Sequence, residues 1–188
     1  DISLIETGPI TIYPSAFNLA AFPNDIIKSL TFDPAQNEKI ELILNFPEDL
    51  KDFNLYTDKQ RLRQVIVNLI SNALKFTAEG HVALSVGKMT GTNMIHFVPD
   101  FSIHEVGGEL ILFTVEDTGI GISQQSRNNI FEPFRKADNH DNPRYGGMGL
   151  GLSIVKSILP VLGGDITFKS QPGVGTTFYF YVPITNDR

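Results

Sequence analysis

The sequence predicts one domain of the α/β class, in which helices and strands are mixed along the chain. The chain has 188 residues, of which 41% are hydrophobic. That is enough for one buried core and too little for two ordinary domains. Apolar residues recur at the helical period over 58–76 and 150–162. Short apolar runs bounded by turn-forming residues predict strands over 40–46, 81–86, 109–116, 166–170 and 176–182.

The segments between these elements complete the outline. Residues 1–8 are typical of the end of a helix, and the prolines that follow indicate an extended entry into the domain. A modest helix is predicted near 19–32. A short helix over 123–129, capped by Ser123, is followed by a mobile loop over 135–148, because that stretch is polar and rich in Gly, Pro and Asn.

The composition excludes several kinds of function. Lys and Arg total 15 against 21 Asp and Glu, a formal charge of −6, and this argues against a domain that holds nucleic acid by its net charge. The absence of cysteine excludes disulfides, thiolate metal sites and cysteine nucleophiles. The sequence contains neither a long apolar run nor a signal-peptide pattern. Because the chain begins with Asp1 rather than Met, we expect a fragment of a longer protein.

The long predicted helix carries polar residues that point to a site. Asn68, Asn72, Lys75 and Phe76 share one face at roughly 100° per residue. Asparagine is a poor residue for a helix interior, so two of them one turn apart suggest a use. Neutral amide oxygens suit Mg²⁺ when phosphates supply the negative charge. Taken alone, these residues are also compatible with a solvated polar face.

Two glycine-containing segments indicate close approach of the backbone to a ligand. In residues 116–122 (EDTGIGI), Asp117 at a strand end precedes Gly119 and Gly121, which suits a carboxylate that accepts a hydrogen bond from an exocyclic amine. Residues 146–153 (GGMGLGLS) run into a helix whose N-terminus favours phosphate. Each segment alone is equally compatible with an ordinary turn or loop, and neither has the Walker or dinucleotide spacing.

Together, in this order, the segments resemble the catalytic and ATP-binding domain of sensor histidine kinases. That family lies within the superfamily of gyrase, heat-shock chaperone, histidine kinase and mismatch-repair ATPases. The matching segments are RLRQVIVNLISNALKFT (61–77), EDTGIGI (116–122), IFEPFRKAD (130–138), GMGLGLSIVK (147–156) and GVGTTF (173–178). The resemblance covers the chain except 88–109. It implies a two-layer α/β sandwich of the Bergerat type, with a mixed sheet of about five strands backed by about three helices.

The resemblance also divides the chain and assigns roles. Residues 1–8 resemble the end of the dimerisation and phosphoacceptor helix region, and 9–188 the catalytic ATP-binding domain with an insertion at 88–109. We expect that insertion to be a hairpin or folded-back loop packed on the domain, or else a docking surface. The implied catalytic and magnesium-binding residues are Asn68, Asn72 and Lys75, with Asn72 as the main Mg²⁺ ligand and Lys75 as a phosphate contact.

The implied ATP contacts fall into two groups. Around the base they are Phe76 beside the adenine, Asp117 on its amino group, Gly119, Gly121 and Ile122 at its border, and Thr177 supporting Asp117. Around the phosphates they are Gly147, Met148, Gly149, Leu150 and Gly151, with Lys136 as a basic lid residue and Phe131 at the lid hinge. Met148 departs from the usual Thr or Ser, but backbone atoms make the contacts at that position.

The resemblance implies a protein-histidine kinase that uses ATP and Mg²⁺. Hydrolytic branches of the superfamily carry a Glu where this chain has Asn68, and an amide cannot take a proton at neutral pH. None of the four histidines stands in the family's phosphoacceptor context, so the fragment is expected to lack its own substrate histidine. A degenerate nucleotide-sensing module and a serine-directed kinase remain alternatives, and the intact 130–138 segment weighs against the second.

The expected partners follow from this assignment. They are the dimerisation and histidine-phosphotransfer domain of the same parent and a response-regulator receiver domain, with no nucleic acid. We expect the fragment to be a monomer of the cytoplasm and the parent to be a homodimeric sensor of a bacterial inner membrane.

Overall fold

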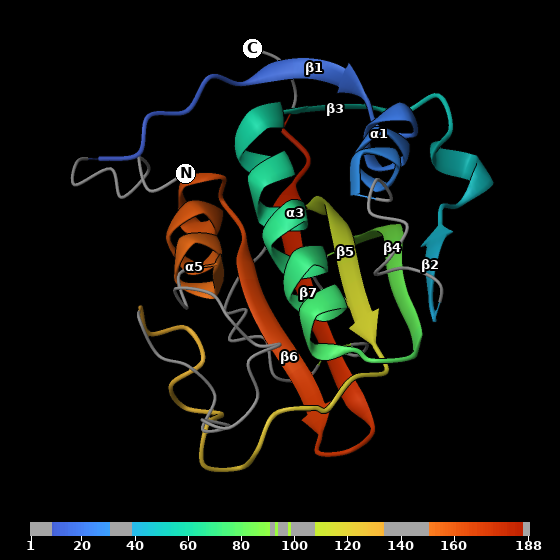
Figure 1. Ribbon diagram of the computed structural model, residues 1–188. Helices are drawn as coiled ribbons and strands as arrows, with labels where there is room; N and C mark the ends of the chain where they lie inside the picture. The colour runs from blue at the N-terminus through green and yellow to red at the C-terminus, as the bar shows by residue number, and fades with distance from the viewer. Residues whose placement is uncertain are drawn as a thin grey trace.

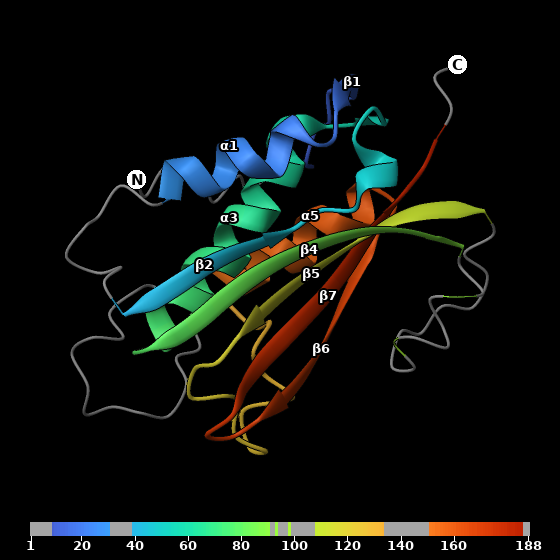
Figure 2. The same ribbon diagram turned by 90° about the vertical axis from the view of Figure 1, so that its right-hand side faces the viewer.

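The computed structural model describes residues 9–30, 39–90, 93, 98, 108–133 and 151–185. These residues form two layers, a five-stranded mixed sheet and a layer of helices that covers one of its faces (Figures 1 and 2). The helices are α1 (Ala21–Leu30), α3 (Lys59–Phe76) and α5 (Gly151–Val161), with a short 3-10 turn η1 (Glu48–Leu50). This arrangement confirms the predicted two-layer α/β sandwich.

The main sheet has the strand order β2-β4-β5-β7-β6. In that order, its strands are β2 (Ile40–Asn45), β4 (Gly80–Thr90), β5 (Glu109–Asp117), β7 (Gly175–Pro183) and β6 (Asp165–Gln171). Strands β2 and β4 are parallel, and the other neighbours are antiparallel. A separate two-stranded sheet pairs β1 (Ser15–Asn18) with β3 (Asn54–Thr57).

Helix α3 is the central element of the helical layer. The Asp58 carboxylate caps it by accepting hydrogen bonds from the backbone N–H groups of Gln60 and Arg61, both at 3.0 Å. The same carboxylate accepts the backbone N–H of Tyr13 at 2.7 Å, which ties the entry segment to the start of the helix. The buried residues of α3 recur at helical spacing and are Leu62, Val65, Ile66, Leu69, Ile70 and Ala73.

Strand alternation divides the sheet into an inner face, which packs on the helices, and an outer face. Phe113 of β5 and Phe180 of β7 are fully buried on the inner face, and their rings stack at a centroid distance of 4.9 Å. The outer face carries a smaller apolar cluster of Val98, Leu110, Leu112 and Tyr181. Val98 belongs to the predicted insertion and is fully buried there.

The predicted helices over 19–32, 58–76 and 150–162 and all five predicted strands are present. The short helix predicted over 123–129 is wrong, because this segment forms successive turns closed by i to i+3 hydrogen bonds. Strands β1 and β3 were not predicted. Strand β4 continues to Thr90 and β5 begins at Glu109. The segment that connects them therefore begins at residue 91 rather than 88. Residues 1–8 and 135–148 lie outside the described residues.

Candidate functional site

The two asparagines of α3 lie against the start of α5. A Cβ built on Gly151, the first residue of α5, would stand 3.6 Å from Asn72 Nδ2 and 3.7 Å from Asn68 Oδ1. The sequence places these amides beside the apolar stripe of α3 rather than within it, so they lie next to the neighbouring helix α5. The structure therefore brings together the polar face of the long helix and the end of the glycine-rich segment.

The Asn68 amide nitrogen is buried and has no hydrogen-bond partner among the residues that the structure describes. A buried donor without a partner is costly, and it indicates a group that is satisfied by a ligand or its water. The oxygen atoms of two neutral amides suit Mg²⁺ held together with phosphate. The side chains present therefore fit a magnesium–nucleotide complex at this point.

Lys75 and Phe76 lie at the C-terminal end of α3. The Lys75 ammonium stands 5.0 Å from the centroid of the Phe76 ring. The Phe76 carbonyl accepts the backbone N–H of Ile120 at 3.1 Å, which holds the glycine loop of residues 119–122 against the end of the helix. One side of the glycine loop is thus fixed by α3.

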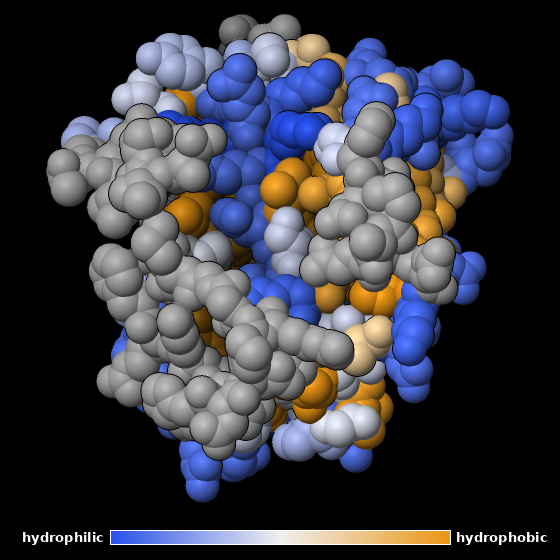
Figure 3. Space-filling model, in the orientation of Figure 1, coloured by the Kyte–Doolittle hydropathy of each residue, from blue (hydrophilic) through white to orange (hydrophobic). Residues whose placement is uncertain are grey.

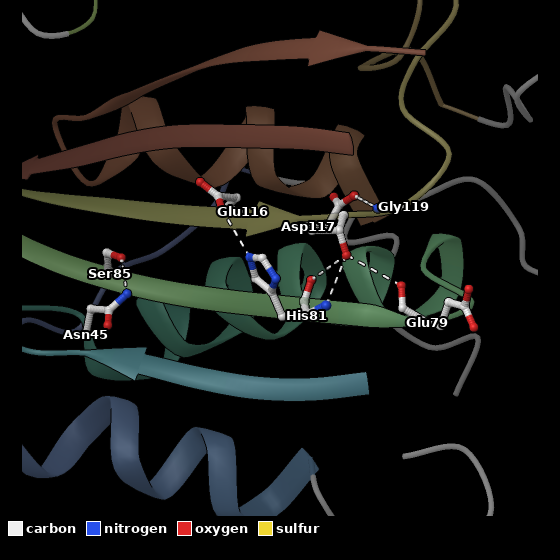
Figure 4. A network of polar contacts seen from close by, with 8 residues as sticks. Asn45, Glu79, His81, Ser85, Glu116, Asp117 and Gly119 are labelled. Atoms are coloured by element: carbon white, nitrogen blue, oxygen red, sulfur yellow. Dashed lines mark hydrogen bonds and ion pairs between the residues drawn. The ribbon is translucent and has the colours of Figure 1, made fainter. Parts of the chain in front are cut away.

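Asp117 is the last residue of β5 and points to the inner face, with 8% of its surface exposed. Its Oδ1 accepts the Gly119 backbone N–H at 2.9 Å (Figure 4). Burial raises the pKa of this carboxyl above its usual value, with a smaller contribution from Glu116, while the backbone N–H groups of Gly119 and Thr176 act against the rise. A buried carboxylate held by the Gly119 N–H presents a fixed acceptor to a ligand.

Only glycine fits at positions 119 and 121 of this loop. A Cβ at Gly119 would lie 2.3 Å from the Phe76 carbonyl oxygen. Gly121 has a φ of 71° and would place a Cβ 2.3 Å from the carbonyl oxygen of Gln171. The loop is therefore held between the end of α3 and the β6–β7 turn. Ile122 closes it and packs against the core.

The role expected for Thr177 as the support of Asp117 is wrong in its geometry. Thr177 pairs with Glu116 in the sheet register, and Thr176 pairs with Asp117. Because side chains alternate along a strand, Thr177 faces the outer side, as Tyr179 does. Thr176, which is buried, is the residue beside Asp117. The register of β5 and β7 is the signal that distinguishes the two threonines, and spacing alone does not supply it.

Phe131 is anchored in the core rather than standing alone in a loop. Its ring lies 6.0 Å from Phe168 and 6.4 Å from Phe178, in edge-to-face contacts. The Lys156 ammonium of α5 lies 5.6 Å from the Phe131 ring centroid. The segment before residue 134 is thus attached to both β6 and α5.

The remaining predicted ATP contacts lie outside the described residues. They are Lys136, Gly147, Met148, Gly149 and Leu150, and their roles stay predictions. In the described part, polar side chains gather over the middle of the helical face, where α3 lies (Figure 3). No helix of the described ranges is both long enough and apolar enough to cross a membrane.

The fold and these residues define a class of protein, an α/β sandwich whose candidate site lies between its helices and a glycine loop. Residues 57–186 match the family described as histidine kinase-, DNA gyrase B-, and HSP90-like ATPase. The chain belongs to this family, and it is similar to histidine kinases.

Two curated relatives illustrate the relationship. The signal transduction histidine-protein kinase BarA of Escherichia coli is 35% identical over 97% of this chain and 18% of its own length. Histidine protein kinase 1 of Candida albicans is 38% identical over 96% of this chain and 7% of its own length. The chain therefore spans less than a fifth of the length of these relatives.

Solved structures agree with the fold. Full-length ShkA in complex with AMPPNP superposes with a TM-score of 0.74 at 26% identity, covering 96% of this chain and 33% of that one. The nucleotide-free catalytic domain of the histidine kinase ThkA superposes with a TM-score of 0.67 at 22% identity, covering 92% of this chain and 97% of that one. The second likeness shows the fold alone.

Proposed function

We propose that this domain binds Mg-ATP and transfers the γ-phosphoryl group to a histidine on a dimerisation domain of its parent, for relay to a response-regulator aspartate. One observation carries the proposal most directly. Asn68 and Asn72 lie against the first residue of α5, and the buried Asn68 amide nitrogen has no partner in the described part of the chain. The likeness to ShkA, solved in complex with the ATP analogue AMPPNP, supports the same assignment.

Each residue has a defined task in this proposal. Asn72, aided by Asn68, would hold the Mg²⁺ ion that ATP brings with it, and Lys75 would contact a phosphate. Asp117 would accept a hydrogen bond from the adenine amino group, beside the Phe76 ring. The bound Mg-ATP supplies the phosphoryl group to be transferred. Lys136 and residues 147–151 would wrap the phosphates.

The chemistry of Asn68 favours transfer over hydrolysis. Phosphoryl transfer through a loose transition state depends on positioning and charge neutralisation more than on a base in this domain. An amide at position 68 cannot deprotonate an attacking water. We therefore infer a kinase rather than an ATPase, acting in the cytoplasm on a helical domain of a homodimeric parent, with no nucleic-acid partner.

The direct test supplies the acceptor in trans. The chain is incubated with γ-labelled Mg-ATP and the parent's dimerisation and histidine-phosphotransfer domain. We expect an acid-labile phosphohistidine on the acceptor, absent when the chain carries Asn72→Ala.

The alternatives give different results. ATP binding without any transfer would indicate the degenerate nucleotide-sensing module. Rapid phosphate release without an acceptor would indicate a hydrolase, and an acid-stable phosphoserine on the acceptor would indicate a serine-directed kinase. Each of these outcomes would overturn the proposed function.

A further inference from the structure

Ser170, near the end of the edge strand β6, lies at a junction that the predicted site does not include. It shares a register row on the inner face with Thr176 of β7 and, beyond it, Asp117 of β5. The three side chains therefore lie side by side across three strands. Ser170 was not among the predicted site residues, because its position relative to Asp117 depends on how the strands pair.

The Ser170 hydroxyl makes three hydrogen bonds. It donates to the Gly175 carbonyl at 3.1 Å and accepts the Ile122 backbone N–H at 2.8 Å. It also lies 2.9 Å from the Thr176 hydroxyl. A serine hydroxyl has one proton and two lone pairs, so these partners use its full capacity.

The bond to Gly175 has a consequence for Asp117. The Gly175 carbonyl and the Thr176 N–H belong to the same planar peptide unit. Ser170 binds the carbonyl end of that unit, and the N–H end belongs to Thr176, which lies opposite Asp117 in the register of β5 and β7. Fixing one end of a rigid plane fixes the direction of the other, so the hydroxyl fixes the backbone beside Asp117.

The same residue also anchors the glycine loop and the segment after it. The bond from the Ile122 N–H to Ser170 ties the glycine loop to β6. A second hydrogen bond, from the Gly173 N–H to the Ile120 carbonyl at 2.8 Å, ties the same loop to the β6–β7 turn. The Ser170 carbonyl accepts a hydrogen bond from the Arg127 guanidinium. Side chain and main chain of one residue thus hold three segments around Asp117.

We propose that Ser170 is a positioning residue for adenine recognition, which acts by holding the Gly175–Thr176 peptide and the 119–122 loop around Asp117. The inference rests on the proposed function, since it assumes that Asp117 reads the adenine amino group. It predicts an effect on the discrimination of the base, whereas a residue of purely structural importance would affect all nucleotides alike.

The test compares Mg-ATP with the triphosphate of purine riboside, which lacks the exocyclic amino group, by calorimetry. For Ser170→Ala we expect ATP affinity to fall about three- to tenfold, the usual range for one lost hydrogen bond. The affinity for purine riboside triphosphate should change less than about twofold. Ser170→Thr keeps the hydroxyl and should restore the preference for ATP. Ser157→Ala removes a hydroxyl that bonds Ile154 on α5, and it should change neither affinity.

A second measurement needs no nucleotide. Hydrogen exchange at the Ile122 amide should accelerate in Ser170→Ala and remain slow in Ser170→Thr, because only the alanine leaves this N–H without its acceptor. If Ser170→Ala does not fold, Ser170→Cys keeps the volume with a weak hydrogen-bonding group and should change the affinities and the exchange in the same direction.

The failures are distinguishable. A wild-type chain that binds neither nucleotide overturns the proposed function and this inference with it. A wild type that binds ATP, together with a Ser170→Ala variant that binds both nucleotides equally well or loses both equally, overturns the positioning role alone.

Discussion

Two adjacent carboxylates at the end of β5 have opposite surroundings. Asp117 faces the helices, is 8% exposed and accepts the Gly119 backbone N–H. Glu116 faces outward with 52% of its side chain exposed, and its Oε1 lies 3.2 Å from His81 Nε2 (Figure 4). Both are acidic, and one step along a strand separates them. The comparison teaches that the face of the sheet, rather than the residue type, decides which carboxylate can serve a site.

The same difference extends across the neighbouring strands. The inner row of Ser170, Thr176 and Asp117 connects to the glycine loop through hydrogen bonds. The outer positions form local pairs, such as His81 with Glu116 and Asn45 with Ser85. The inner face therefore carries the larger core and the residues of the proposed site, and the outer face carries local pairs and the smaller apolar cluster.

The largest expected effect concerns the core of the inner face. Phe180→Ala should lower the free energy of unfolding by about 3–5 kcal/mol, because it removes a fully buried ring stacked on Phe113. Tyr179→Ala, one residue away on the outer face, should cost no more than about 2 kcal/mol. Denaturant unfolding followed by circular dichroism measures both, and equal losses would contradict the division into faces.

The next effect concerns Mg-ATP binding. Asn72→Ala should weaken Mg-ATP binding on the order of 10–100-fold, as expected when a hydrogen-bonding or metal-binding contact to a charged ligand is lost. Asn45→Ala, which removes an exposed amide bonded to Ser85 at 3.1 Å, should leave the affinity within about twofold. Calorimetry with Mg²⁺ and then with EDTA is the measurement. The wild-type advantage over Asn72→Ala should shrink in EDTA, and an advantage that persists there would count against a role through the metal.

A smaller effect should appear in the pH dependence of stability. Because burial raises the Asp117 pKa, the folded chain binds more protons than the unfolded chain at pH values just above the ordinary Asp pKa of about 3.9. This group therefore lowers the free energy of unfolding as pH rises through that window. Asp117→Asn removes this destabilising contribution, so the variant should have a higher free energy of unfolding than wild type at neutral pH. The difference in free energy between the two should fade below the ordinary Asp pKa. A difference that instead grows as pH falls would show that the pKa is lowered.

The smallest effect is expected for the outer pair. His81→Ala breaks a partly exposed contact with Glu116, and such pairs contribute about 0–1 kcal/mol. Mg-ATP affinity should be unchanged. A tenfold loss of affinity in His81→Ala would place the outer face in the site.

The sequence pattern predicted the elements with strong periodicity and failed where structure depends on pairing. Helix α3 shows both a capping residue, Asp58, and a buried stripe, so its position was predictable. Strands β1 and β3 span four residues each, too short for a clear alternation. The turns after Ser123 have helix-compatible composition, but no apolar face selects an α-helix there.

The candidate site was predictable in part for the same reason. Asp117 and Asn72 belong to segments whose residue types carry chemical information by themselves. The resemblance implies Thr177 rather than Thr176, because the two threonines are adjacent and only the register with β5 distinguishes them. Ser170 lies five residues from Gly175, on the other side of a turn, and only the paired strands bring its hydroxyl to that carbonyl.

The central claim is that Asp117, and not its neighbour Glu116, reads the nucleotide from the inner face. Calorimetric titration of Mg-ATP into Asp117→Asn and Glu116→Gln, two neutralising substitutions of nearly equal size, tests it directly. We predict a loss on the order of 10–100-fold for Asp117→Asn and less than about twofold for Glu116→Gln. Equal affinities in the two variants, or a larger loss in Glu116→Gln, would contradict the account.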